Sequence, residues 1–211
     1  MKIYFVRHGE TYLNKYKKMQ GWSDSPLTPQ GEKVAYETGE KLKNIPFSTV
    51  YTSDLGRTIQ TARLILEGNR HFDSENIQPL KELRETFFGS FEADLGSNVY
   101  PKVAEKHGIS VSDVFGKLSL NQISDTMKEL DPYDDAESSK EFENRLLKGL
   151  SKITDNSEEK NEVLVVTHGN TIRHIVKKIS PTTNVFQEIG NSSVTTVDYQ
   201  NGQLKLLTFN A

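Results

Sequence analysis

An arginine and a histidine stand side by side at Arg7 and His8, directly after the β-prone apolar run Ile3–Val6. A continuous apolar run is typical of a strand buried on both faces, as in a parallel sheet. Ligands of open α/β sheets bind at the carboxyl ends of the strands. We therefore expect Arg7 and His8 to face a ligand, and Gly9 to let the backbone turn there without a Cβ clash.

A second histidine follows another apolar run, Val163–Thr167, where His168 precedes Gly169-Asn170. A helix is predicted immediately afterwards, over Thr171–Ile179. A strand that runs into glycine and then a helix presents free backbone N–H groups, which bind anions. The net charge of −3 gives no bulk attraction for an anionic ligand, so the arginine-containing segments must supply a local cationic pocket.

The residues that could do chemistry fall in four segments, and together they resemble the histidine phosphatase superfamily, also called the phosphoglycerate mutase-like family. The similarity covers nearly the whole chain. Each segment lies at a predicted strand end or in the loop after it. The segments are Arg7–Thr11 with Asn14, Ser53–Thr58, Leu83–Glu85 followed by Gly89, and Thr167–Asn170.

The resemblance implies phosphoryl transfer through a covalent intermediate. His8 would be the nucleophile, neutral when it attacks, with its other ring nitrogen held against a backbone carbonyl. Arg7 and Arg57 would bind phosphate oxygens through planar donors, and both disfavour the imidazolium form of His8. His168 would donate hydrogen bonds to the transferring oxygens. Glu85 would protonate the leaving alkoxide and then activate water.

Other residues are expected around the phosphate. Asn14 and the Gly169 amide would complete its pocket, and the resemblance places Gln20 and Gly21 near the substrate. Arg57 is predicted in the first turn of a helix, where the helix dipole opposes a cation by roughly a few tenths of a kcal/mol. This misfit favours phosphate binding over a generic surface charge.

Two carboxylates compete for the acid role. The family pattern puts the acid four residues before a glycine, which selects Glu85, before Gly89, over Glu82. Glu82 is interpreted as a solvated charge. Glu92 lies where many relatives have Glu-Gly, but Ala93 follows it here, which weakens the case for a role of Glu92.

The predicted elements define an α/β protein, a three-layer α/β/α sandwich whose mostly parallel sheet has an antiparallel C-terminal edge. Asn201-Gly202 between two strand-like runs is a strong hairpin signal, and Thr28-Pro29 marks a helix start. Strands are also expected at Thr49–Thr52, Ile77–Leu80, Ser193–Tyr199 and Gln203–Phe209, helices at Pro29–Lys43, Asp54–Glu67 and Glu141–Ile153, and connectors at Gly68–Asn76 and Asn156–Asn161.

The whole chain, residues 1–211, is expected to form a single domain. A mainly helical insertion over residues 93–160 is expected to hang over the strand ends as a lid, by analogy with the resembled family. Lys102, Lys106 and His107 are candidates for substrate contact within it, although a hydrated helix face is the favoured interpretation of all three.

Composition excludes several classes of protein. The longest apolar runs are four residues, too short to cross a bilayer, and with a net charge of −3 neither a membrane nor a nucleic acid is expected as a partner. The absence of cysteine excludes disulfides and thiolate catalysis. No signal peptide precedes the first strand, which favours the cytoplasm. No metal or other cofactor is expected, because the two motif histidines lie far apart and the arginines repel a cation.

The leading interpretation is a metal-independent phosphomonoesterase that hydrolyses a small phosphorylated metabolite through a phosphohistidine. Bisphosphoglycerate-dependent phosphoglycerate mutase is the nearest alternative. Mutases of the resembled family carry a further cationic cluster after the glutamate motif, whereas Asp94–Pro132 contains no arginine. A non-catalytic phosphate-binding regulator would usually have lost the nucleophile or the acid, and His8 and Glu85 are both present. The predicted edge hairpin is compatible with a monomer or a homodimer.

Overall fold

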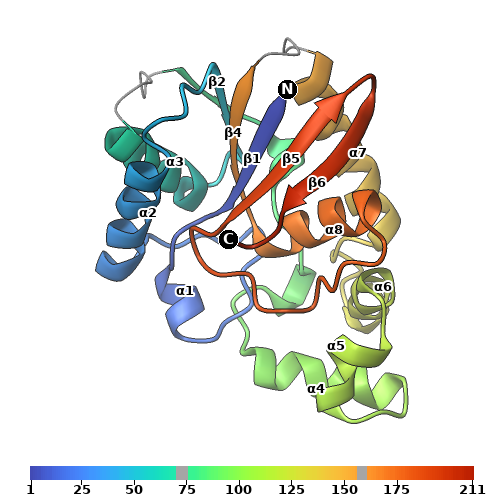
Figure 1. The fold of residues 1–211 in the computed structure, drawn as a ribbon. Coiled ribbons are helices and arrows are strands. Elements are labelled where there is room, and N and C mark those ends of the chain that lie inside the picture. The colour runs from blue at the N-terminus through green and yellow to red at the C-terminus, as the bar shows by residue number, and fades with distance from the viewer. Residues whose placement is uncertain (70–75, 156–160) are drawn as a thin grey trace.

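A computed structural model describes residues 1–69, 76–155 and 161–211 of the chain. Within them, one sheet has the strand order β3-β2-β4-β1-β5-β6 (Figure 1). The first four of these strands run parallel, and the last two form an antiparallel edge. The strands are β1 (Lys2–Arg7), β2 (Thr49–Thr52), β3 (Ile77–Pro79), β4 (Glu162–Thr167), β5 (Val194–Gln200) and β6 (Gln203–Thr208).

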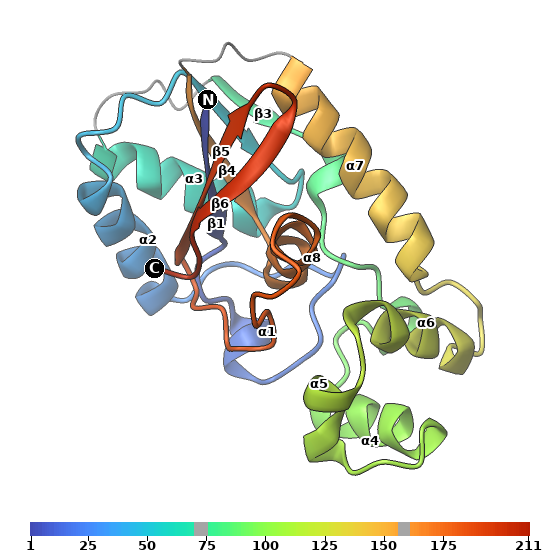
Figure 2. The same cartoon turned by 45° about the vertical axis from the view of Figure 1, so that its right-hand side comes forward.

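Alternate residues of the central strand β1 face the two sides of the sheet. Ile3 and Phe5 enter one apolar core, which α7 and α8 cover, and Tyr4 and Val6 enter the other, which α2 and α3 cover (Figure 2). This arrangement explains the uninterrupted apolar run and confirms the predicted three-layer fold. The covering helices are α2 (Pro29–Lys41), α3 (Gly56–Asn69), α7 (Ser139–Asp155) and α8 (Gly169–Ile179).

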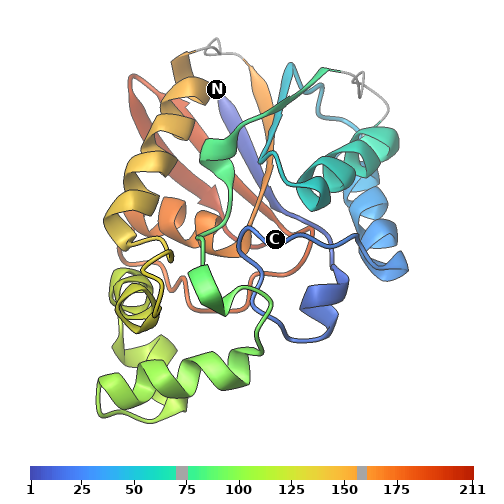
Figure 3. The ribbon, with the colours of Figure 1, turned by 180° about the vertical axis from the view of Figure 1, so that it is seen from behind.

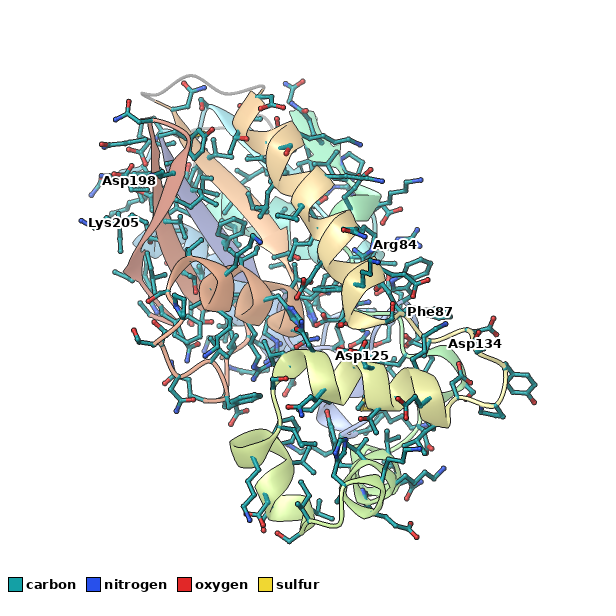
Figure 4. The ribbon with its side chains drawn as sticks, turned by 90° about the vertical axis from the view of Figure 1, so that its right-hand side faces the viewer. Arg84, Phe87, Asp125, Asp134, Asp198 and Lys205 are labelled. Carbon is teal, nitrogen blue, oxygen red and sulfur yellow. The ribbon has the colours of Figure 1, made fainter. Side chains whose placement is uncertain are left out.

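Three shorter helices lie beyond the carboxyl ends of the parallel strands (Figure 3). They are α4 (Gly96–Lys106), α5 (Val114–Lys117) and α6 (Leu120–Leu130), and they share an apolar cluster of their own. Asp125 on α6 accepts hydrogen bonds from the backbone N–H and hydroxyl of Ser139 at the start of α7, at 2.8 and 2.9 Å (Figure 4). The α4–α6 part of the predicted insertion stands over the strand ends, whereas α7 packs against the sheet (Figure 3).

The predicted elements are present, with small differences at their ends. The β5–β6 hairpin turns at Asn201 and Gly202, whose φ angles of 51° and 77° are those of a type I′ turn. Asp198 and Lys205 pair across it (Figure 4). The predicted connectors at 68–76 and 156–161 fall largely outside the described residues. No helix in the described part of the chain is long and apolar enough to span a membrane.

The helices differ from the prediction by a turn or less. α2 ends at Lys41 rather than Lys43, α3 starts at Gly56 rather than Asp54, and α8 starts at Gly169. The earlier start of α8 places the first backbone N–H groups of the helix directly after His168. A short helix, α1 (Tyr12–Lys15), follows the β1 loop.

Candidate active site

The carboxyl ends of three neighbouring strands bring the sequence motifs together. Arg7 ends β1 and lies opposite Thr167, which ends β4. The His8 backbone N–H donates to the Thr167 carbonyl at 2.9 Å, and the Ser53 N–H donates to the carbonyl of Val166, near the end of β4. Ordinary sheet hydrogen bonding thus places His8, His168 and the segment before α3 together at the carboxyl ends of the strands.

His8 is buried and held in one orientation. Its Nδ1 lies 2.8 Å from the Gly9 carbonyl oxygen, and because a carbonyl can only accept, we assign the proton to Nδ1 and the lone pair to Nε2. Burial lowers the pKa of His8 well below its ordinary value, and the charges of Arg57 and Arg7 lower it further. The ring is therefore neutral at physiological pH, with Nε2 available as a nucleophile.

The loop after β1 needs a glycine because its backbone passes close to α2. Gly9 has no positive φ, so its role is the predicted avoidance of a Cβ clash and not a left-handed backbone conformation. A Cβ at Gly9 would lie 2.8 Å from the carbonyl oxygen of Gly31 in α2, a distance that real Cβ atoms essentially never show. The missing side chain lets the loop after β1 lie directly on α2.

His168 takes part in a chain of hydrogen bonds behind His8. Arg57 Nη2 donates to His168 Nδ1 at 2.9 Å, which leaves the proton on Nε2, 2.8 Å from Ser53 Oγ. Ser53 Oγ in turn lies 2.8 Å from Thr58 Oγ1. The His8 and His168 rings meet edge to face, with centroids 5.3 Å apart. Both ring nitrogens of His168 thus have protein partners among the described residues.

Arg57 is more firmly fixed than a surface cation. It is 1% exposed and donates to Asp24 Oδ1 at 3.0 Å, to the Ser23 carbonyl at 2.9 Å and to the Gly21 carbonyl at 2.7 Å. Three acceptors in the loop before α2 therefore aim the guanidinium back toward the strand ends. The Asp24 carboxylate also offsets the unfavourable helix dipole at this position.

Two buried donors on the wall of the cavity have no protein partner among the described residues. Arg7 Nη1 donates to the Ile189 carbonyl, but Arg7 Nε is unpartnered. Gln20 accepts from the Thr11 hydroxyl at 2.7 Å through Oε1, so its unpartnered Nε2 also remains. Buried polar groups without a partner are rare and costly. Both donors suit an anionic ligand in this cavity.

Glu85 is positioned by backbone amides. Its carboxylate accepts from the Thr86 N–H and from the Asn170 N–H in the first turn of α8, each at 2.9 Å. Burial raises the pKa of Glu85, while the two amides and the Arg57 and Arg173 charges oppose that rise. The carboxyl therefore keeps its proton to a higher pH than an ordinary glutamate.

Glu82, the competing carboxylate, is not solvated as predicted. It is 8% exposed, and its Oε1 pairs with Lys152 Nζ on α7 at 2.7 Å. The 3₁₀ turn at Lys81–Leu83 directs the side chain toward α7 and away from the strand edge. Glu82 thus has a structural partner and lies outside the wall of the cavity that Glu85 lines.

A cavity of about 440 Å³ opens over these groups. Of the predicted site residues, its wall includes Arg7, His8, Asn14, Gln20, Glu85 and Gly169. Arg57, His168 and Gly21 lie behind the wall. Lys102, Lys106 and His107 are exposed on or just after α4 and do not line the cavity, which agrees with the favoured interpretation of a hydrated helix face.

Sequence reasoning missed Arg173, which also lines the cavity. Its Nε donates to the Val185 carbonyl at 2.8 Å and its Nη2 to the Gln187 carbonyl at 3.1 Å. It follows Gly169 by four residues, so one turn of α8 places it on the face that Gly169 presents to the cavity. That spacing was the available signal. Glu188 lines the cavity nearby.

Arg145 on α7 anchors the main chain that carries Glu85. No motif in the sequence predicted this role. It donates to the carbonyls of Glu82, Arg84 and Glu85 at 2.9, 3.0 and 3.1 Å. A paired carboxylate, Glu137 at 2.7 Å, fixes its guanidinium. Arg84, within this segment, and Phe87, just after it, lie beside α7 (Figure 4).

Glu92 has an assignable role after all. Its carboxylate accepts from the backbone N–H groups of Gly21, Trp22, Ser23 and Phe88, at 2.8 to 3.1 Å. It therefore holds the loop whose carbonyls bind Arg57. A Cβ at Gly21 would lie 2.2 Å from Glu92 Oε1, so Gly21 serves this contact and does not face the cavity.

We expect Glu92→Gln to destabilise the fold by about 2–4 kcal/mol, because the amide nitrogen faces N–H groups that then lack an acceptor. Urea unfolding measures this loss. Glu129→Gln is the matched control, since the exposed Glu129–Lys106 pair, 3.3 Å apart, contributes little. Equal stability of the two variants would contradict the anchoring role of Glu92.

In the described part of the chain, no group of three or more histidine, aspartate or glutamate side chains is arranged to hold a metal ion. The fold is that of the phosphoglycerate mutase-like class of proteins. The chain belongs to the histidine phosphatase superfamily (branch 1), whose family model matches residues 3–211. The family that the four motifs predicted is thereby confirmed.

Some of the similar proteins are named as mutases and others as phosphatases. The crystal structure of phosphoglycerate mutase from Bacillus anthracis is 33% identical, with a TM-score of 0.94 over 100% of this chain and 92% of that one. "Probable phosphoglycerate mutase GpmB" from Klebsiella pneumoniae is 48% identical over 67 residues, 32% of this chain and only 31% of its own length. Alpha-ribazole phosphatase from Shigella flexneri shares the fold at 21% identity, with a TM-score of 0.75 over 100% of this chain and 96% of that one.

Proposed function

We propose that this protein is a metal-independent phosphomonoesterase that hydrolyses a small phosphorylated metabolite through a phosphohistidine at His8. The observation that carries the proposal is the fixed tautomer of His8, whose Nδ1 bond to the Gly9 carbonyl leaves the neutral Nε2 as the nucleophilic atom. Arg7 and Glu85 line the same cavity, so an anion-binding group and an acid lie beside the nucleophile.

The reaction has two displacements at phosphorus. Arg7 Nε, Gln20 Nε2 and the Gly169 amide bind the phosphate oxygens. His8 Nε2 then forms a bond to phosphorus as the ester oxygen leaves, and Glu85 gives that oxygen its proton. In the second step, Glu85 accepts a proton from water while the water oxygen attacks phosphorus. The P–N bond breaks, which releases phosphate and restores neutral His8.

Arg57 and His168 act from behind the nucleophile. The positive charge of Arg57 lies close to the growing charge on the phosphoryl oxygens, and such fixed charge is effective in a buried site. His168 carries a proton on Nε2 and lies against the His8 ring. In this proposal, the bond from Nε2 to Ser53 Oγ is exchanged for one to a phosphoryl oxygen during transfer.

Hydrolysis is favoured over mutation because the cavity offers little to hold a second anionic group. Beyond the phosphate site, its cations are Lys18 and Arg173. Arg173 already donates to two backbone carbonyls, and the Glu188 carboxylate attracts it. The α4–α6 segment contributes no arginine. The non-catalytic alternative is disfavoured because nucleophile and acid are both held in place.

The proposal is tested by following the fate of the phosphoryl group. Purified protein is expected to release phosphate from 4-nitrophenyl phosphate, with inhibition by vanadate and no effect of EDTA. With 3-phosphoglycerate and added 2,3-bisphosphoglycerate, ³¹P NMR should show free phosphate in excess over 2-phosphoglycerate. Rapid formation of 2-phosphoglycerate would identify a mutase. If no ester is turned over, the non-catalytic phosphate-binding alternative is supported instead.

The pH profile of kcat/KM should differ in two ways from that expected for a histidine and a glutamate with ordinary pKa values. A lowered His8 pKa keeps the nucleophile neutral as pH falls, so the rate should not drop through pH 6.5, after correction for ionisation of the substrate phosphate near pH 6. The raised Glu85 pKa places the alkaline loss above the range of a normal glutamate. If kcat/KM falls between pH 7 and 6 because a group of the enzyme gains a proton, the assignment of His8 as a neutral nucleophile is contradicted.

A further inference from the structure

The cavity has two chemically different walls. Arg7, His8 and Glu85 form the wall at the strand ends, where phosphate is proposed to bind. The facing wall comes from α4, α5, α6 and the segment after α8, and most of its side chains are apolar. The ester's alcohol must occupy the space between the phosphate and this wall.

Three aromatic side chains form a row along the apolar wall. Tyr100 from α4 and Phe115 from α5 meet edge to face, with centroids 4.8 Å apart. Phe186, from the segment after α8, lies 6.2 Å from Phe115. All three line the cavity. The row thus joins the helices over the strand ends to the main body of the fold.

Phe115 is 43% exposed although the apolar cluster of α4–α6 lies beside it. Ile123 and Met127 from α6 extend the same surface toward the interior of the cavity. An apolar surface that stays open at a binding cavity gains free energy when a ligand covers it. Flat rings pack well against such aromatic edges and faces.

We propose, on the basis of the phosphatase function above, that the alcohol part of the substrate carries a planar, largely apolar ring that packs against Tyr100, Phe115 and Phe186. A cavity of about 440 Å³ lies in the size range of sites for drug-sized ligands and is larger than a three-carbon acid needs. The small number of cations in the cavity agrees with this proposal, because an uncharged ring needs no cationic partner.

The test compares two esters that differ in the ring alone. 2-Phenylethyl phosphate and ethyl phosphate both release primary alcohols of similar acidity, so their chemical steps are matched. We expect kcat/KM to be about tenfold or more higher for the phenylethyl ester, from the apolar area that the ring buries. Equal values for the two esters would overturn the inference and leave the phosphatase proposal standing.

Variants locate the effect. Phe115→Ala should reduce the ratio of the two kcat/KM values severalfold, mainly through a higher KM for the phenylethyl ester. Tyr133→Ala is the control, because Tyr133 is an aromatic residue that is 74% exposed and does not line the cavity. An equal fractional loss for both esters in Phe115→Ala would overturn the inference. Absence of hydrolysis of both esters and of 4-nitrophenyl phosphate would overturn the proposed function itself.

Discussion

His8→Ala is expected to abolish the phosphoenzyme and to lower kcat on the order of 10⁴-fold or more. Loss of a nucleophile removes the covalent route entirely, and the remaining binding groups sustain only a small residual rate. Rapid quenching of the wild-type protein with a ³²P-labelled ester should trap an acid-labile, base-stable label. Mass spectrometry of the base-stabilised protein should place the label on His8.

The control for this experiment is His107→Ala, since His107 is exposed just after α4 and its Nε2 lies 2.8 Å from the Thr126 hydroxyl, away from the cavity. The control protein should retain both label and turnover. A label that is stable to acid, as on serine, would reject the proposed intermediate. So would full activity in His8→Ala.

Glu85→Gln is expected to slow hydrolysis of alkyl phosphates by about 10²- to 10⁴-fold, the usual contribution of a positioned acid or base. The amide keeps the carbonyl oxygen that can accept from the Asn170 N–H, so vanadate affinity should stay within a few fold. With 4-nitrophenyl phosphate, whose leaving group needs little protonation, the first step should survive. The phosphoenzyme should then accumulate, because no base activates water.

Accumulation of phosphoenzyme distinguishes this role from a structural one. Glu82→Gln provides the comparison, because Glu82 pairs with Lys152 and lies outside the cavity wall. Its turnover should be close to that of the wild type. Equal losses in the two variants, or wild-type turnover in Glu85→Gln, would remove Glu85 from the mechanism.

The fold could be predicted because short stretches of sequence determine its strands and turns. The apolar run of β1 alternates between two cores, so its composition alone indicated a strand covered on both faces. Asn201-Gly202 specified the hairpin through the positive φ angles that it adopts. Motifs that follow parallel strands meet at one sheet edge by topology, and this placed Arg7, His8 and His168 together.

The contacts that hold the site in place could not be predicted, because each joins segments far apart in the sequence. Glu92 reaches the loop at Gly21, and Arg145 reaches the carbonyl of Glu85. Neither residue belongs to a local pattern that differs from a solvated helix or loop charge. Glu82 was misjudged for the same reason, since its partner Lys152 lies on α7.

The position of β1 between β4 and β5 has a consequence for how the protein loses activity. The strand that leads into His8 is the earliest in the chain, yet its neighbours on both sides come from the last third. Partial opening of the C-terminal third therefore separates His8 from His168 before the N-terminal helices need to move. Catalysis should fail at the onset of denaturation, which makes turnover a sensitive gauge of whether the two ends of the polypeptide remain joined.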